Sequence, residues 1–160
     1  MKTNSVAVAV LSAALFLGIF PEGLLAQESV AQLDLKARKN MLLTESSDLE
    51  GMAKSLNGTE SSVALSIDEK IGQGVMEIDA VYWFVGIYES MQNDQDREVA
   101  KAVLKNRLAF YSYLLGLGAD QTAGQLAFTK LPAIAQAGAQ ARDNLRAAKN
   151  KLDEIAASLN

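Results

Sequence analysis

The stretch 131–159 most constrains the fold, because its apolar and small side chains recur in alternating steps of three and four without a break. Its members are Leu131, Ile134, Gly138, Ala141, Leu145, Ala148, Leu152, Ile155 and Leu159. This spacing over four consecutive heptads predicts a long helix that packs on its neighbours at a shallow angle. At 1.5 Å per residue the helix would extend about 43 Å. Pro132 suits its first turn, where the missing N–H has no intrahelical partner to lose.

The rest of the chain is divided by turn signals into further helical segments. Ala, Leu, Gln, Glu and Lys are frequent and favour helix, and no sustained alternating run of β-branched residues predicts a strand. The predicted helices are 28–56, 61–91, 96–117 and 131–159, with a shorter separate helical piece at 119–130. The first helix is expected to kink or restart across 44–47. Gly58 is expected to end it, and Gly116 and Gly118 to stop the third.

Apolar residues on one face of each remaining helix mark its predicted core side. In the first helix these are Val30, Leu33, Ala37, Met41, Leu49, Met52, Ala53 and Leu56; in the second they are Ile67, Ile71, Gly74, Ile78, Val81, Val85 and Tyr88. The third carries Val99, Val103, Phe110, Leu114 and Leu117, widened by Leu104, Leu108, Tyr111 and Leu115. Together the segments predict an all-α fold, an antiparallel four-helix bundle. A three-helix bundle with a ragged first segment is the alternative.

Residues 1–26 have the composition of an export signal. Lys2 precedes an apolar run from Val6 to Phe20, Pro21 then breaks the run, and Ala26 offers a small residue for cleavage. The run is shorter than the roughly 20 apolar residues that span a bilayer. We therefore expect a cleaved signal peptide, with an uncleaved N-terminal anchor as the alternative. Residues 27–160 would then form one helical domain, periplasmic or secreted and without stable membrane insertion.

Composition excludes several function classes. The 160-residue chain has no Cys and no His, which removes Cys/His zinc sites, Ser-His-Asp triads and cysteine nucleophiles. Its net charge of −4 argues against binding nucleic acid, which needs clustered Lys and Arg. No motif indicates a catalytic residue, a cofactor or a metal site.

The second helix carries an unusual apolar back. Opposite its core side, Met76, Ala80, Trp83, Phe84, Ile87 and Met91 recur at helical spacing. A bundle helix normally presents charged residues to water there. Either the piece 119–130, with Leu126 and Phe128, folds over this face, or the face is exposed and contacts a partner or ligand.

Arg107 falls inside the apolar arc of the third helix and requires a counter-ion. In a hairpin that turns at 92–96, position 107 lies level with 79–82. Asp79 is therefore the predicted partner in a structural ion pair, with Glu77 as the second choice.

These observations predict an exported, non-enzymatic bundle that acts through protein–protein contact, either with an unidentified protein or with itself. Its contact residues would be Met76, Trp83, Phe84, Ile87 and Met91. The alternative is a small apolar-ligand-binding bundle, with a pocket lined by Trp83, Tyr88, Phe110 and Tyr111.

Overall fold

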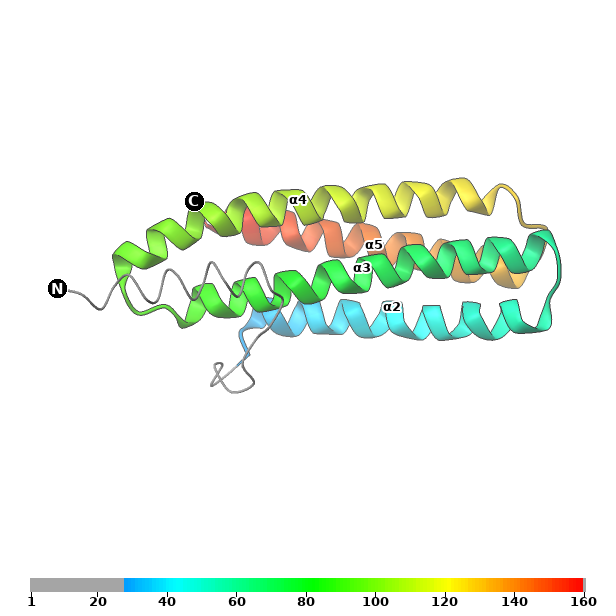
Figure 1. Ribbon diagram of the computed structural model, residues 1–160, viewed down its shortest axis with the longest axis horizontal. Helices are drawn as coiled ribbons and strands as arrows, with labels where there is room; N and C mark the ends of the chain where they lie inside the picture. The colour runs from blue at the N-terminus through cyan, green and yellow to red at the C-terminus, as the bar shows by residue number, and fades with distance from the viewer. Residues whose placement is uncertain (1–27, 160) are drawn as a thin grey trace.

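The structure, a computed structural model, describes residues 28–159, which form helices and no strand (Figure 1). The four helices of this part of the chain are α2 (Val30–Ser55), α3 (Thr59–Ser90), α4 (Asp94–Leu126) and α5 (Pro132–Ser158). The all-helical class is thus confirmed, with the four helices of a bundle. The predicted signal peptide, 1–26, lies outside the described residues.

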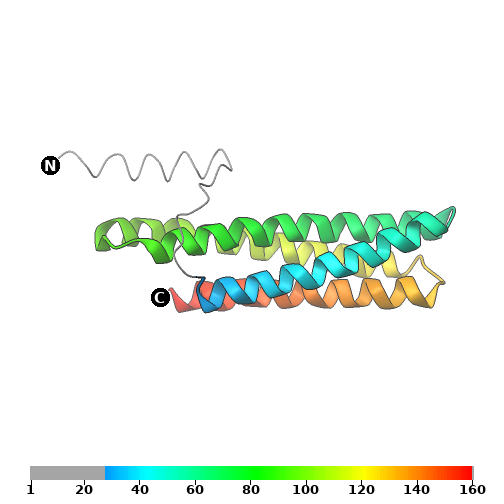
Figure 2. The same ribbon diagram turned by 90° about the horizontal axis from the view of Figure 1, so that it is seen from below.

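The helices lie side by side, and the turns that join them alternate between the two ends (Figures 1 and 2). Each helix packs against its neighbours in the ring α2–α3–α4–α5, with closer contact between α2 and α3 and between α4 and α5 than across the diagonal from α3 to α5. One polar contact joins two turns at the same end. Glu60 accepts hydrogen bonds from the Thr129 hydroxyl (2.5 Å) and the Lys130 backbone N–H (2.8 Å).

The core runs the length of the bundle between the four helices. Its largest fully buried apolar side chains are Leu35, Leu42, Leu49, Ile67, Ile71, Ile78, Leu108, Leu115, Ile134, Leu145 and Leu152. On α5 the interior positions of the predicted period are buried from Ile134 to Ile155, and Pro132 occupies the first turn. On α3 the predicted positions Ile67 to Val85 are buried as well. The core sides of α3 and α5 are therefore confirmed.

Helix α4 is longer than predicted, because its glycines do not stop it. Gly116 and Gly118 lie inside a continuous 33-residue helix, and the separate piece 119–130 was a wrong prediction. A Cβ at Gly116 would lie 3.4 Å from the Lys149 side chain, and one at Gly118 would lie 3.8 Å from Leu145. Both glycines therefore lie beside side chains of α5 at ordinary contact distance, and packing of α4 against α5 stabilises the helix through them.

The predicted core side of α4 was right only at its edge, where Leu104, Leu108 and Leu115 are buried, and wrong at its centre. The buried residues are Ala100, Leu104, Leu108, Ser112, Leu115, Ala119 and Thr122. Four of the five residues that defined the predicted side, Val99, Val103, Phe110 and Leu117, are instead between 38% and 58% exposed. Helix α4 therefore carries apolar residues on two sides. The side that faces the core is the one that also contains Ser112 and Thr122.

Helix α2 is continuous, so the predicted kink across 44–47 does not occur. In its first half the predicted core side was wrong, because Val30, Leu33, Ala37 and Met41 are exposed. The buried side includes two polar residues, Gln32 and Glu45. Gln32 donates to the Tyr82 carbonyl (3.2 Å), and Glu45 accepts from the Asn144 amide (2.5 Å). These partners on α3 and α5 satisfy the Gln32 amide and one carboxylate oxygen of Glu45, whereas Glu45 Oε2 is buried without a hydrogen-bond partner. At the start of the helix, Ser29 and Gln32 form a capping box.

No helix within residues 28–159 is long and apolar enough to cross a bilayer.

Candidate functional site

The apolar back of α3 is open to solvent. Met76 is 66% exposed, and Trp83, Phe84, Ile87 and Met91 are half-buried. The piece 119–130, which was predicted to cover this face, instead includes the last part of α4, where Leu126 packs beside Gly138 of α5. Phe128 follows in the turn and is 64% exposed. The first of the two predicted arrangements for this face, coverage by 119–130, is therefore wrong.

A second apolar row lies on the neighbouring helix. We name it the outer seam of α4; it consists of Val99, Val103, Asn106, Phe110, Tyr113 and Leu117. All six are exposed, and the five apolar or aromatic members range from 38% (Val103) to 65% (Tyr113). Their spacing of 4-3-4-3-4 keeps them within one stripe of the helix. Sequence reasoning found four of the six but assigned them to the core.

The α3 residues and the outer seam meet along a shallow crevice. Phe84, Ile87, Tyr88 and Met91 of α3 line it together with Ala100, Val103 and Leu104 of α4. Phe84 also stacks on Tyr111, with ring centroids 6.2 Å apart and planes inclined by 28°. The apolar back of α3 (Met76, Trp83, Phe84, Ile87 and Met91) and the outer seam therefore form one surface, which we call the α3/α4 face; Trp83 lies at its edge nearest α2.

The residues proposed to line a ligand pocket are spread over this side of the molecule. The crevice at Tyr88 has a volume of about 20 Å³, whereas ligand pockets measure roughly 300–1,000 Å³. Phe110 is 51% exposed and packs edge-on against Tyr111, and Trp83 lies toward α2. The geometry therefore favours a flat contact surface over an enclosed aromatic pocket.

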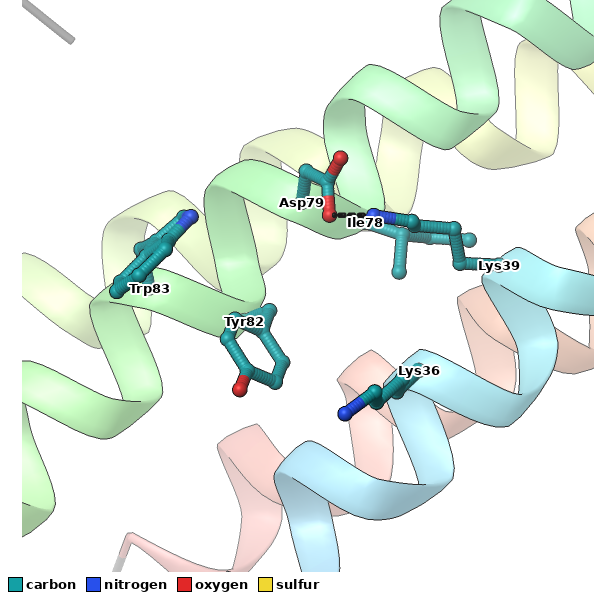
Figure 3. Close-up of a pocket in the computed structure, with 6 residues that line it drawn as sticks. All are labelled: Lys36, Lys39, Ile78, Asp79, Tyr82 and Trp83. Atoms are coloured by element: carbon teal, nitrogen blue, oxygen red, sulfur yellow. Dashed lines mark hydrogen bonds and ion pairs between the residues drawn. The ribbon is translucent and has the colours of Figure 1, made fainter. Parts of the chain in front are cut away.

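A larger depression of about 310 Å³ lies between α2 and α3 (Figure 3). It is lined by Lys36, Lys39, Ile78, Asp79, Tyr82 and Trp83. Figure 3 shows Lys39 reaching across from α2 to Asp79, with 2.6 Å between Nζ and Oδ1. The Tyr82 ring packs edge-on against Trp83, with centroids 5.5 Å apart. Apart from Asp79 and Trp83, sequence reasoning did not assign these residues to a site.

The other charges at this depression are also paired. Glu28 Oε1 accepts a hydrogen bond from the Tyr82 hydroxyl (2.5 Å) and one from Lys36 Nζ (2.9 Å). The bond from Tyr82, followed by that from Lys36, lowers the pKa of Glu28. The same bond, with burial second, raises the pKa of Tyr82 to about 12. These ion pairs and hydrogen bonds tie the start of α2 to α3, and Trp83 lies at their edge.

The predicted ion pair between Asp79 and Arg107 is not the one that forms. Asp79 pairs with Lys39, because it lies on the flank of α3 that faces α2. The α4 arginine that contacts an α3 aromatic ring is Arg97, which lies 5.1 Å from the centroid of Tyr88.

Two acids, the half-buried Glu77 and the exposed Asp153, differ in their surroundings. Burial raises the pKa of Glu77 on α3 to about 7, and no opposing interaction contributes. Burial would also raise the pKa of Asp153 on α5, but hydrogen bonds from Lys149 and Ser112, both 2.6 Å, outweigh it and lower the pKa. Asp153 thereby joins α5 to α4, whereas no interaction offsets the burial of Glu77.

Comparison with models of known protein families finds no match, and searches of curated proteins and of solved structures find none either. The geometry of the chain itself therefore carries the functional argument. Its most distinctive element is the α3/α4 face, an apolar surface with no covering segment among residues 28–159.

Proposed function

We propose that this chain is an exported, non-enzymatic protein that acts through protein–protein contact and works in the periplasm or outside the cell. Residues 1–26 direct export and are removed, and the remainder is an antiparallel four-helix bundle. The α3/α4 face is the contact surface, and its binding partner is a protein.

The observation that carries this proposal is the exposure of large apolar side chains on two adjacent helices. Met76 and Tyr113 are each about two-thirds exposed, and Val99 and Phe110 are more than half exposed. On soluble proteins, contiguous apolar patches of this kind mark contact sites. Aromatic residues and Met are also enriched where proteins bind each other.

The polar depression between α2 and α3 supports a different role. Its lysines are already paired with Asp79 and Glu28 within the chain. A ligand would have to break these pairs to use their charges. We therefore assign the depression to holding α2 against α3, and we assign contact to the apolar face.

Substitution of Trp83 tests the proposed surface. The variant Trp83→Ser should fold, because Trp83 is half-buried and outside the core, and it should lose both self-association and capture of partners from the native envelope. Light scattering measures self-association, and cross-linking in the envelope measures capture of partners. Leu65→Ser, at an α3 residue that is 50% exposed and does not belong to the α3/α4 face, is the control. Unchanged oligomeric state and unchanged capture in Trp83→Ser would contradict the proposal.

The same residue reports on the ligand alternative. Trp83 is the only tryptophan in the chain, so its emission can be followed without interference. A saturable shift in emission on adding small apolar molecules, with no cross-linked protein from the α3/α4 face, would replace the contact proposal with ligand binding.

A further inference from the structure

The outer seam of α4 is symmetric about its own midpoint. Its spacing of 4-3-4-3-4 reads the same in both directions, with the centre level with Leu108. An isologous contact requires a surface of this kind, because each residue i must meet residue j while residue j meets residue i. Any heptad stripe with an even number of members has this spacing, so the choice of a second copy depends on which side chains the layers combine.

We propose that the occupant of the outer seam is a second copy of this chain, with the two α4 helices antiparallel and their twofold axis level with Leu108. This inference rests on the proposed function, because it names the partner of the same face. Three layers then form twice: Val99 against Leu117, Val103 against Tyr113, and Asn106 against Phe110.

The sizes of the side chains fit the antiparallel arrangement. The first half of the seam carries Val, Val and Asn, and the second half carries Phe, Tyr and Leu. Each antiparallel layer therefore combines a smaller side chain with a larger one, which gives layers of similar width. A parallel pair would place Phe110 on Phe110 and Tyr113 on Tyr113 while leaving Val99 on Val99, so its layers would differ in width and pack poorly.

The surroundings of the seam also suit close approach of a second helix. Ala102 and Ala109 lie beside the seam one heptad apart, and both are exposed. Small residues allow helix axes to come near each other. No member of the seam is charged, and Asn106 is its one polar side chain. A single polar residue in an apolar seam restricts the registers in which two helices can pair.

The available surface is smaller than the one that a stable dimer buries. The seam spans about 27 Å from residue 99 to residue 117. With the adjoining flank of α3, where Ile87 and Met91 border Val103, the plan area is roughly 500 Å². A stable interface buries about 800 Å² of accessible surface per partner. We therefore expect a dissociation constant in the micromolar range.

The dependence of association on ionic strength distinguishes a second copy of this chain from a basic protein partner. Lys2 and Glu22 cancel, so removal of 1–26 leaves the net charge at −4. Two such chains repel at long range, and salt screens the repulsion. Self-association should therefore tighten as ionic strength rises, whereas binding of a basic protein would weaken.

Sedimentation velocity of residues 27–160 over about 1–100 μM tests the dimer. Phe110→Asp should sediment as a monomer throughout, with unchanged helix content because Phe110 is 51% exposed. Phe128→Asp is the matched control, since Phe128 is 64% exposed in the turn after α4, and it should dimerise like the unmodified chain. Equal behaviour of the two variants would overturn the proposal.

Spin-label distances test the antiparallel register. The chain has no native cysteine, so Ala109→Cys and Gln95→Cys each give one label beside the seam. Across the antiparallel dimer the two Ala109 positions lie within about one helix spacing, roughly 10 Å, and the two Gln95 positions lie about 40 Å apart. Short distances at both positions would indicate a parallel dimer and contradict the proposed register.

Monomeric behaviour at every concentration would overturn self-association while leaving the proposed function intact, provided that Trp83→Ser still loses capture of another protein. A monomer that binds phospholipid vesicles, and that loses this binding in Phe110→Asp, would assign the seam to a lipid surface and overturn both proposals. A dimer that is lost in Phe110→Asp and tightens with salt supports the inference.

Discussion

Helices α4 and α5 pack against each other, yet they present opposite kinds of surface to solvent. Helix α5 has one apolar side, which is buried from Ile134 to Ile155, and its outer residues form ion pairs such as Arg146–Asp120 and Lys151–Asp34. Helix α4 has a buried side and, in addition, the exposed outer seam. The difference separates the apolar residues that form the core of the bundle from those that lie exposed on its surface.

The same Leu→Ala substitution, made once on each helix, should distinguish the buried side of α5 from the outer seam of α4 most clearly. Leu145→Ala removes a fully buried side chain of α5 and should lower the free energy of unfolding by about 2–5 kcal/mol. Leu117→Ala makes the same change on the outer seam, where the side chain is 41% exposed, and should cost less than about 1 kcal/mol. Urea unfolding at a concentration where the chain is monomeric measures both. Equal losses would mean that the outer seam is part of the core.

The same comparison explains which parts of the fold could be predicted from sequence. On α3 and α5 one unbroken period dominates, and the predicted core positions are buried. On α4 the exposed side carries Val99, Phe110 and Leu117, whereas the buried side includes Ser112 and Thr122. Because hydrophobicity was the only criterion, the more apolar side was taken for the core.

The other errors arose from contacts between residues far apart in sequence. Gln32 and Glu45 can be buried because Tyr82 and Asn144 supply hydrogen bonds from 50 and 99 residues away. Periodicity within one segment contains no information about such partners. The α3 part of the candidate site could be predicted because its signal, apolar residues on the side opposite the core, lies within the sequence of a single helix.

The contrast between Glu77 and Asp153 should appear as a difference in pH dependence. The pKa of Glu77 is raised to about 7 by burial, so its contribution to stability is fully present below the unfolded pKa of about 4.5 and is lost as pH rises through 7. Glu77→Gln should remove this loss. The variant should be more stable than the original by about 1–2 kcal/mol at pH 8, after allowance for partial exposure, and similar to it at pH 4.

Asp153→Asn provides the opposite case. The pKa of Asp153 is lowered, so its contribution is present above the unfolded pKa and is lost as pH falls through the folded one. This variant should be less stable than the original at pH 7. Chemical denaturation of both variants from about pH 2 to pH 8 measures the two trends. Parallel curves for Glu77→Gln and the original chain would contradict the assignment.

The smallest expected effect concerns the ion pair between α2 and α3. Asp79→Asn should cost less than about 1 kcal/mol, because both side chains of the Lys39–Asp79 pair are partly exposed. A double-mutant cycle with Lys39→Gln should show a coupling energy, whereas a cycle with Arg107→Gln should show none. Coupling to Arg107 alone would restore the pairing that sequence reasoning predicted.

Hydroxyl-radical footprinting of the unmodified chain tests the central claim most directly, since it measures which side chains are covered without changing any of them. As concentration rises from about 1 to 100 μM, oxidation of Phe110 and Tyr113 should fall. Oxidation of Phe128, which lies in the turn after α4, should stay constant. Equal oxidation of Phe110 and Tyr113 at both concentrations would contradict a contact of this face with a second copy.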